Sequence, residues 1–370
     1  MAESQLFQPL TVGRMRLKHR IGMCPLTRFR ASNDHVPTPT MKEYYTQRAS
    51  VPGTLIITEG TFISLAQSGY DNVPGIYNDA QVDAWRSITD AVHAKGSFIY
   101  CQLWALGRAA TSVIAAKNGV AVTSSGNLPI GESNAVPVPL TTEQIRQTAQ
   151  DYAAAARNAI RAGFDGVELH GANGYLIDQF IQDTCNNRTD EYGGSVEKRS
   201  RFAVEAVQAV VAAVGPDRTG IRLSPWSKFQ AMGMADPITQ FSDVISKIAP
   251  LGLAYLHLVE PRVSGVLDVE TADSLKFAYD IWKGPMLVAG GHSAASAQRL
   301  VGLEYPDRDI VVMFGRYFIS NPDLAFRIRE GLDFTPYERN KFYSPSPTEG
   351  YTDYSFSKEY LDSTRILAKA

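Results

Sequence analysis

The sequence is poor in cysteine and carries little net charge. Its 370 residues include three cysteines, Cys24, Cys101 and Cys185, and the formal net charge is -2. The odd number and the spacing of the cysteines fit neither a metal site nor a redox pair, so we expect reduced thiols in a cytoplasmic protein. Lysine and arginine are spread along the chain, which argues against nucleic acid or an anionic membrane as a partner.

Several familiar motifs are absent as well. Without Gly-x-Gly-x-x-Gly or Gly-x4-Gly-Lys-Ser/Thr, neither a Rossmann domain nor a P-loop is expected. The lack of Gly-x-Ser-x-Gly argues against a serine hydrolase. The six histidines form no His-Glu-x-x-His motif, so we expect no metal site. No apolar run approaches the ~18 residues of a membrane span, and the first residues do not resemble a signal peptide.

The sequence does contain a repeated alternation of short apolar runs and helical stretches. The runs span residues 21–25, 54–58, 97–103, 166–169, 219–223, 254–258, 286–288 and 310–314. Buried strands that alternate with helices are typical of parallel β/α units. Eight units favour a closed barrel over an open sheet, so we predict an α/β protein with one TIM (β/α)8 barrel domain over residues 1–370.

Apolar residues at helical spacing predict helices between these runs. The clearest span residues 79–95, 142–162, 195–214 and 240–249, with Thr142 as a candidate N-cap. Two segments lack such a pattern. We expect residues 111–140, which are rich in Ser, Gly and Pro, to form an excursion over the barrel mouth. Residues 335–370 are expected to form a C-terminal tail, folded back in residues 335–354, rather than a second domain.

The end of the fourth apolar run carries the most informative cluster. His170, Asn173 and Tyr175 follow the run directly, and Gly171 and Gly174 allow the loop between them to turn tightly. In an α/β barrel, catalytic side chains lie at the C-terminal ends of the strands. These three residues are therefore our candidate catalytic set.

Glycines and an arginine follow the seventh and eighth runs, where barrel enzymes commonly bind phosphate. Gly290, Gly291 and Gly315 allow backbone N–H groups to approach a phosphate closely. Arg316 adds a fixed positive charge. The pattern indicates a phosphate-binding site at these two strand ends.

Arg222 lies within an otherwise apolar strand, where a charge needs a partner. That partner is either a carboxylate in the core or the electron-rich edge of a cofactor. Gln102 and Thr27 can add uncharged hydrogen bonds to a heterocycle. Together with the phosphate site, these residues indicate flavin mononucleotide (FMN). His257, at the end of the sixth run, is a weaker candidate for facing the same site.

The chain also resembles the Old Yellow Enzyme family of FMN-dependent ene-reductases. The segments that carry the resemblance are residues 25–28, 55–60, 102–104, 170–175, 187–194, 222–225 and 314–322. The His170/Asn173 pair is similar to the yeast-like and plant-like branch, and residues 48–53 and 184–187 look fungal. Some bacterial branches carry Cys in place of Thr27, and Cys24 is expected to be structural. Gly291 departs from the pattern, because yeast members have Asn there.

The resemblance implies a barrel that is capped by an N-terminal β-hairpin and holds FMN non-covalently. The implied FMN contacts are Pro25, Leu26, Thr27, Gly60, Gln102, Arg222, Gly290, Gly291, Gly315 and Arg316. The implied substrate pocket contains Tyr70, Trp104, Phe229 and Tyr343. His170 and Asn173 are expected to bind the substrate oxygen, and Tyr175 is expected to protonate Cα while reduced flavin gives hydride to Cβ.

The implied activity is that of an NADPH dehydrogenase that reduces the C=C bond of an enone, enal or nitroalkene, as a monomer or homodimer. The alternative is a member of fungal secondary metabolism that acts on an alkaloid aldehyde such as chanoclavine-I aldehyde, as a reductase or an isomerase. Relatives that behave like isomerases carry Phe at the position of Tyr175, so Tyr175 favours reduction. A flavin-binding protein without turnover is a further alternative. The substrate depends on residues 111–140 and 267–276, whose course the sequence does not define.

Overall fold

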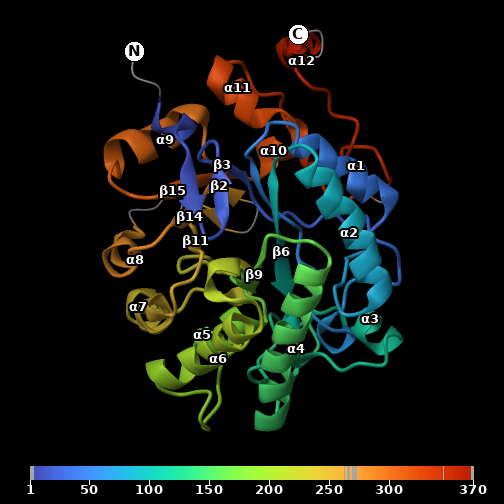
Figure 1. Ribbon diagram of the computed structural model, residues 1–370. Helices are drawn as coiled ribbons and strands as arrows, with labels where there is room; N and C mark the ends of the chain where they lie inside the picture. The colour runs from blue at the N-terminus through green and yellow to red at the C-terminus, as the bar shows by residue number, and fades with distance from the viewer. Residues whose placement is uncertain (1–3, 262, 265–266, 269–272, 345, 368–370) are drawn as a thin grey trace.

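Eight parallel strands close into a barrel at the centre of the protein (Figure 1). The computed structural model describes residues 4–261, 263–264, 267–268, 273–344 and 346–367. In barrel order the strands are β3 (Ile21–Met23), β4 (Leu55–Ile57), β6 (Phe98–Trp104), β9 (Gly166–Gly171), β10 (Thr219–Leu223), β11 (Tyr255–Val259), β14 (Met286–Ala289) and β15 (Ile310–Phe314). Pairing of β15 with β3 and of β4 with β6 closes the ring. The predicted strands and the TIM-barrel fold are confirmed.

The barrel strands are apolar throughout because both of their faces are covered. Along β14 and β15 every residue is buried. Leu287 and Val311 pack in the cluster that fills the barrel interior. Their neighbours Val288 and Val312 belong to the cluster that includes the outer helices. Since successive side chains of a strand point to opposite faces, a continuous apolar run is what a doubly covered strand requires.

Helices surround the barrel (Figure 1). They are α1 (Pro39–Arg48), α2 (Asp79–His93), α3 (Ser112–Lys117), α4 (Thr142–Arg161), α5 (Leu176–Ile181), α6 (Val196–Val214), α7 (Pro237–Ile248), α8 (Lys276–Ile281), α9 (Ala294–Arg299), α10 (Arg316–Ser320), α11 (Leu324–Glu330) and α12 (Lys358–Leu367). The predicted helices correspond to α2, α4, α6 and α7. In the described part of the chain, no helix is both long and apolar enough to cross a membrane.

Two predicted helix starts need correction. Thr141, not Thr142, is the N-cap of α4: its hydroxyl accepts from the N–H of Gln144 (3.2 Å), and the Gln144 side chain accepts from the N–H of Thr141 (2.9 Å). Helix α7 begins at Pro237, before the predicted residue 240. The Asp236 side chain caps that end, and proline suits the first position of a helix.

An N-terminal hairpin closes the end of the barrel opposite the strand C-termini. Its strands β1 (Leu10–Val12) and β2 (Met15–Leu17) are antiparallel and place their apolar residues in the interior cluster. Gly13, with φ of 55°, forms the turn, where a Cβ would lie 2.2 Å from the carbonyl oxygen of Asp217. Because Asp217 precedes β10, this contact places the hairpin at the N-terminal ends of the strands.

The segment over the barrel mouth contains more structure than we predicted. Residues 112–117 form α3, and the short strands β7 (Thr123–Ser124) and β8 (Val138–Pro139) pair further along. Helix α3 has six residues and no side-chain hydrogen bond at its N-cap. Such a short helix leaves no periodic signal in the sequence. The remaining short strands are β5 (Thr61–Phe62), β12 (Val263–Ser264) and β13 (Leu267–Asp268), and residues 269–272 lie outside the described residues.

The C-terminal tail folds back over the barrel mouth. The buried Arg28 side chain donates to the carbonyl of Phe342 (3.0 Å), and Arg48 donates to the carbonyl of Tyr351 (2.9 Å). The Tyr351 ring stacks on Tyr44 with centroids 4.1 Å apart. These contacts bring an aromatic segment, distant in sequence, to the wall of the site described next.

Candidate active site

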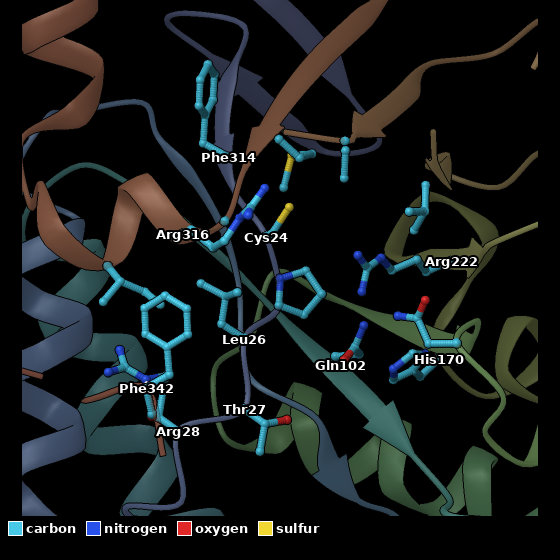
Figure 2. A pocket seen from close by; sticks show the side chains of 18 of the residues that line it. Cys24, Leu26, Thr27, Arg28, Gln102, His170, Arg222, Phe314, Arg316 and Phe342 are labelled. Carbon is cyan, nitrogen blue, oxygen red and sulfur yellow. The ribbon is translucent and has the colours of Figure 1, made fainter. Parts of the chain in front are cut away.

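A cavity of about 530 Å³ opens at the C-terminal ends of the barrel strands. The volume lies in the range of small-molecule and cofactor sites. Figure 2 shows its side chains converging from both sides, with Arg222, Gln102 and His170 facing Arg316 and Cys24. Of the residues predicted from the sequence, it is lined by Pro25, Leu26, Thr27, Tyr70, Gln102, Trp104, His170, Asn173, Tyr175, Arg222, Phe229, Gly290, Gly291, Gly315, Arg316 and Tyr343.

Gly60 is the exception, because it does not belong to the cavity wall. A Cβ on Gly60 would lie 2.4 Å from the ring of Trp104. The glycine therefore makes room for Trp104, which does line the cavity. The contact of Gly60 with FMN stays a prediction.

Sequence reasoning missed several wall residues. They are Arg28, Phe29, Val259, Ala289, His292, Met313, Phe314, Tyr317, Ile319, Tyr337 and Phe342, together with Cys24, which we expected to be structural. Those on β14 and β15 look like ordinary core residues in the sequence. Tyr337 and Phe342 come from the tail, of which the family resemblance indicated only Tyr343 as a pocket residue. Burial raises the pKa of the Cys24 thiol to about 12, so the thiol is protonated.

The loop after β9 is held in an unusual conformation. Asn173 has φ of 58°, in the left-handed region that residues other than glycine rarely adopt. Its N–H donates to the hydroxyl of Ser224 (2.7 Å), and its carbonyl accepts from the Gln230 side chain (3.1 Å). Such strain persists only where surrounding contacts impose it, and it concentrates at functional sites.

His170 is buried, Tyr175 is partly buried, and both rings pack against Trp104. The Tyr175 ring lies 4.9 Å from the ring of His170 and 4.7 Å from that of Trp104. Burial, and then the nearby Arg222 and His257, lower the pKa of His170 well below its usual value, so its imidazole is neutral. Burial raises the pKa of Tyr175, so its phenol keeps its proton. The pair therefore offers uncharged hydrogen-bond donors to a bound molecule.

A buried polar layer lies beneath this wall. Glu168 accepts from the Gln102 side chain (2.8 Å) and pairs with His257 Nδ1 (2.7 Å). The core carboxylate, Glu168, is thus bonded to Gln102 and His257, and no hydrogen bond joins it to Arg222 among the described residues. The Arg222 Nε is buried without a hydrogen-bond partner in the described residues. His257 is fully buried in this layer and is not part of the cavity wall.

These residues fit FMN. The unpartnered Arg222 Nε points to a ligand edge that can accept a hydrogen bond. Gly290 cannot carry a Cβ without approaching the Glu260 side chain to 2.6 Å, and Gly291 has φ of 65°. Both glycines line the cavity, as does Arg316, so their backbone N–H groups and the guanidinium are available to a phosphate there. Among the described residues, no three His, Cys, Asp or Glu side chains gather as a metal site would need.

The sequence of residues 5–334 matches the NADH:flavin oxidoreductase / NADH oxidase family. The chain belongs to this family. The structure superposes on Old Yellow Enzyme from Pichia sp. AKU4542 with a TM-score of 0.90 and 41% sequence identity, covering 97% of this chain and 95% of that one. The resemblance to the Old Yellow Enzyme family is thereby confirmed, and membership implies FMN as the cofactor.

Two fungal relatives are similar over nearly their full length. A chanoclavine-I aldehyde reductase of Penicillium roqueforti is 56% identical over 368 residues, which cover 99% of this chain and 100% of the relative. An NADP-dependent oxidoreductase of Aspergillus flavus is 51% identical, covering 97% and 98% of the two chains. The protein is therefore a flavin-family oxidoreductase with reductases among its relatives.

Proposed function

We propose that the protein uses NADPH to reduce the C=C bond of an α,β-unsaturated carbonyl or nitro compound. The observation that carries the proposal is that His170, Asn173 and Tyr175 share one cavity wall with Gln102 and Arg222. FMN held by Gln102, Arg222 and Arg316 would supply the hydride that the alkene Cβ requires, with NADPH as the reductant. NADPH and the alkene use the cavity in turn.

His170 and Asn173 bind the substrate oxygen. A neutral imidazole donates a hydrogen bond without placing a full charge in the cavity, and the lowered pKa of His170 keeps it in that form. Asn173 contributes an amide donor from a loop whose backbone is fixed on Ser224 and Gln230. Two fixed donors at one oxygen polarise the conjugated alkene, which makes Cβ electrophilic.

Tyr175 donates the proton that completes the reduction. Its raised pKa keeps the phenol protonated over the physiological range. The proton passes from Tyr175 Oη to the substrate Cα while Cβ gains hydride, so that one H⁻ and one H⁺ add across the double bond. Solvent then returns the proton to the phenolate.

Aromatic side chains line another part of the cavity. The ring of Phe29 lies 6.0 Å from that of Tyr70 and 5.6 Å from that of Tyr343, and Tyr70 lies 5.8 Å from Trp104. The three pairs are edge-to-face or tilted, with interplanar angles of 70°, 69° and 59°. An aromatic wall of this kind suits a conjugated substrate, because offset and edge-to-face contacts with its π system are favourable.

A second candidate is an alkaloid aldehyde. The relative from Penicillium roqueforti is named a chanoclavine-I aldehyde reductase, and it matches this chain from end to end. A conjugated aldehyde presents the same oxygen and alkene to His170, Asn173 and Tyr175 as a cyclic enone does. The presence of Tyr175 as a proton donor favours net reduction over isomerisation.

Anaerobic titration tests the proposal. NADPH should bleach the yellow protein, and 2-cyclohexenone or a conjugated aldehyde should restore the flavin spectrum with formation of the saturated carbonyl compound. A protein that is bleached but is not reoxidised by any enone, enal or nitroalkene would refute the proposed activity while leaving flavin binding intact.

A further inference from the structure

The short helix α5, which follows the catalytic loop directly, is buried on all sides. Every residue from Leu176 to Ile181 is buried, including the polar Asp178 and Gln179. Buried carboxylate and amide groups must form hydrogen bonds to be stable. Most partners of these two side chains are backbone groups of the loops around the cavity mouth, and the others are the side chains of Ser124 and Gln182.

Asp178 and Gln179 hold the peptide groups on both sides of Gly174. The Gly174 N–H donates to Asp178 Oδ2 (2.8 Å), and its carbonyl accepts from Gln179 Nε2 (2.7 Å). Gly174 lies between Asn173 and Tyr175, which both line the cavity. The two contacts therefore fix the orientation of the residues before and after it.

Gln179 also binds the start of the mouth excursion. Its Oε1 accepts from the N–H of Arg108 (3.0 Å) and from the hydroxyl of Ser124 (2.8 Å), and its Nε2 donates to the carbonyl of Leu106 (3.0 Å). The approach is close enough that a Cβ on Gly107 would lie 2.0 Å from Gln179 Oε1.

Gln182 extends the network to the loop after β10. Its Nε2 donates to Asp178 (2.9 Å), and its Oε1 accepts from the N–H groups of Gly233 (2.8 Å) and Met234 (3.2 Å). The same loop carries Phe229, which lines the cavity.

Arg108 connects the mouth excursion to the loop after β10. Its guanidinium donates to the carbonyl of Leu128 (2.9 Å) in the excursion and to the carbonyl of Gln230 (3.0 Å). The Gln230 side chain in turn donates to the carbonyl of Asn173 (3.1 Å). The chain of contacts thus returns to the catalytic loop from which it started.

We propose that Gln179 and Asp178 are positioning residues that hold Asn173 and Tyr175 in place and link them to the two mouth loops. The excursion and the Phe229 loop then move together with the oxygen-binding and proton-donating side chains. The inference deepens the proposed function and, for its kinetic part, rests on it.

Gln179→Met tests the proposal, because methionine has a similar length and volume but none of these hydrogen bonds. Gln147→Met is the matched control, since Gln147 is exposed on α4 and donates to Asp151 at the surface (3.0 Å). The first measurement compares the two half-reactions by stopped-flow absorbance. We expect flavin reduction by NADPH to be nearly unchanged in Q179M and reoxidation by 2-cyclohexenone to fall about tenfold to a hundredfold.

The second measurement is amide hydrogen exchange, which does not depend on activity. We expect residues 170–175, 104–126 and 229–234 to lose protection together in Q179M and to remain protected in Q147M. An unchanged reoxidation rate, an equal loss in both half-reactions, or faster exchange confined to one segment would overturn the proposal.

Two further results separate the possible failures. If the reduced wild-type protein is not reoxidised by any activated alkene, the proposed function is wrong. The hydrogen-exchange comparison of Q179M with Q147M still tests whether Gln179 links the three segments, because it does not depend on activity. If Q179M does not fold, Gln182→Met decides by the same measurements, with loss of protection expected in both 229–234 and 170–175.

Discussion

Replacing Tyr175 with phenylalanine removes one oxygen atom from the cavity and leaves its aromatic packing in place. The ring keeps its contacts with Trp104 (4.7 Å) and His170 (4.9 Å), so the cavity retains its shape. A positioned general acid contributes roughly 10²–10⁴ in rate, which corresponds to about 3–5 kcal/mol of activation free energy. We expect reoxidation of the reduced flavin by an enone to slow by that factor, and reduction by NADPH to change little.

Stopped-flow measurement of both half-reactions checks this prediction. Tyr343→Phe is the matched control, because it removes a phenol from the same cavity at a residue without a proposed chemical role. The solvent isotope effect on the reoxidation rate should differ from the wild-type value in Y175F and should equal it in Y343F. Equal losses in both half-reactions of Y175F, or an equal effect of Y343F, would refute the assignment of Tyr175 as the proton donor.

Three further predictions follow from other contacts. Arg222→Met should weaken FMN binding about tenfold to a hundredfold, the value of a lost charged hydrogen bond, as measured by flavin fluorescence; unchanged affinity would contradict the role of Arg222. Burial raises the pKa of Glu59 from 4.5 to about 7, so its contribution to folding stability is present below about pH 4.5 and is lost as the pH rises towards 7. Glu59→Gln should therefore gain stability over wild type by up to about 3 kcal/mol across that window, in denaturant titrations at each pH, and a pH-independent difference would refute this. Thr141→Ala should cost about 1 kcal/mol through loss of the α4 cap, with activity unchanged.

The barrel could be predicted because its strands follow a simple physical rule. A strand that is covered on both faces must carry apolar side chains on both of them, and eight such apolar runs recur between helices. Helix α3 and the start of α7 were missed or misplaced for local reasons. The first has six residues and no side-chain cap, and the second is set by Asp236 and Pro237 rather than by the apolar pattern.

The polar residues of the site were predicted where they end a barrel strand, as His170 and Arg222 do. What the sequence could not provide is contact between distant segments. Phe342 lies at the cavity wall in a segment that is held by contacts with distant residues, among them the hydrogen bond from Arg28 to its carbonyl. Glu168 looks like part of an ordinary strand, and its pairing with His257 depends on strands far apart in sequence. The close approach of the Trp104 ring to Gly60 likewise depends on packing between separate strands, which the sequence alone does not display.

The most direct test of the account is the position of deuterium in the product. A cyclic enone or conjugated aldehyde is reduced by unlabelled NADPH in D₂O, and the product is examined by NMR. Proton donation from the exchangeable phenol of Tyr175 predicts one deuterium at Cα, none at Cβ and an intact carbonyl group. Deuterium at Cβ, or an alcohol with the double bond retained, would contradict the central claim.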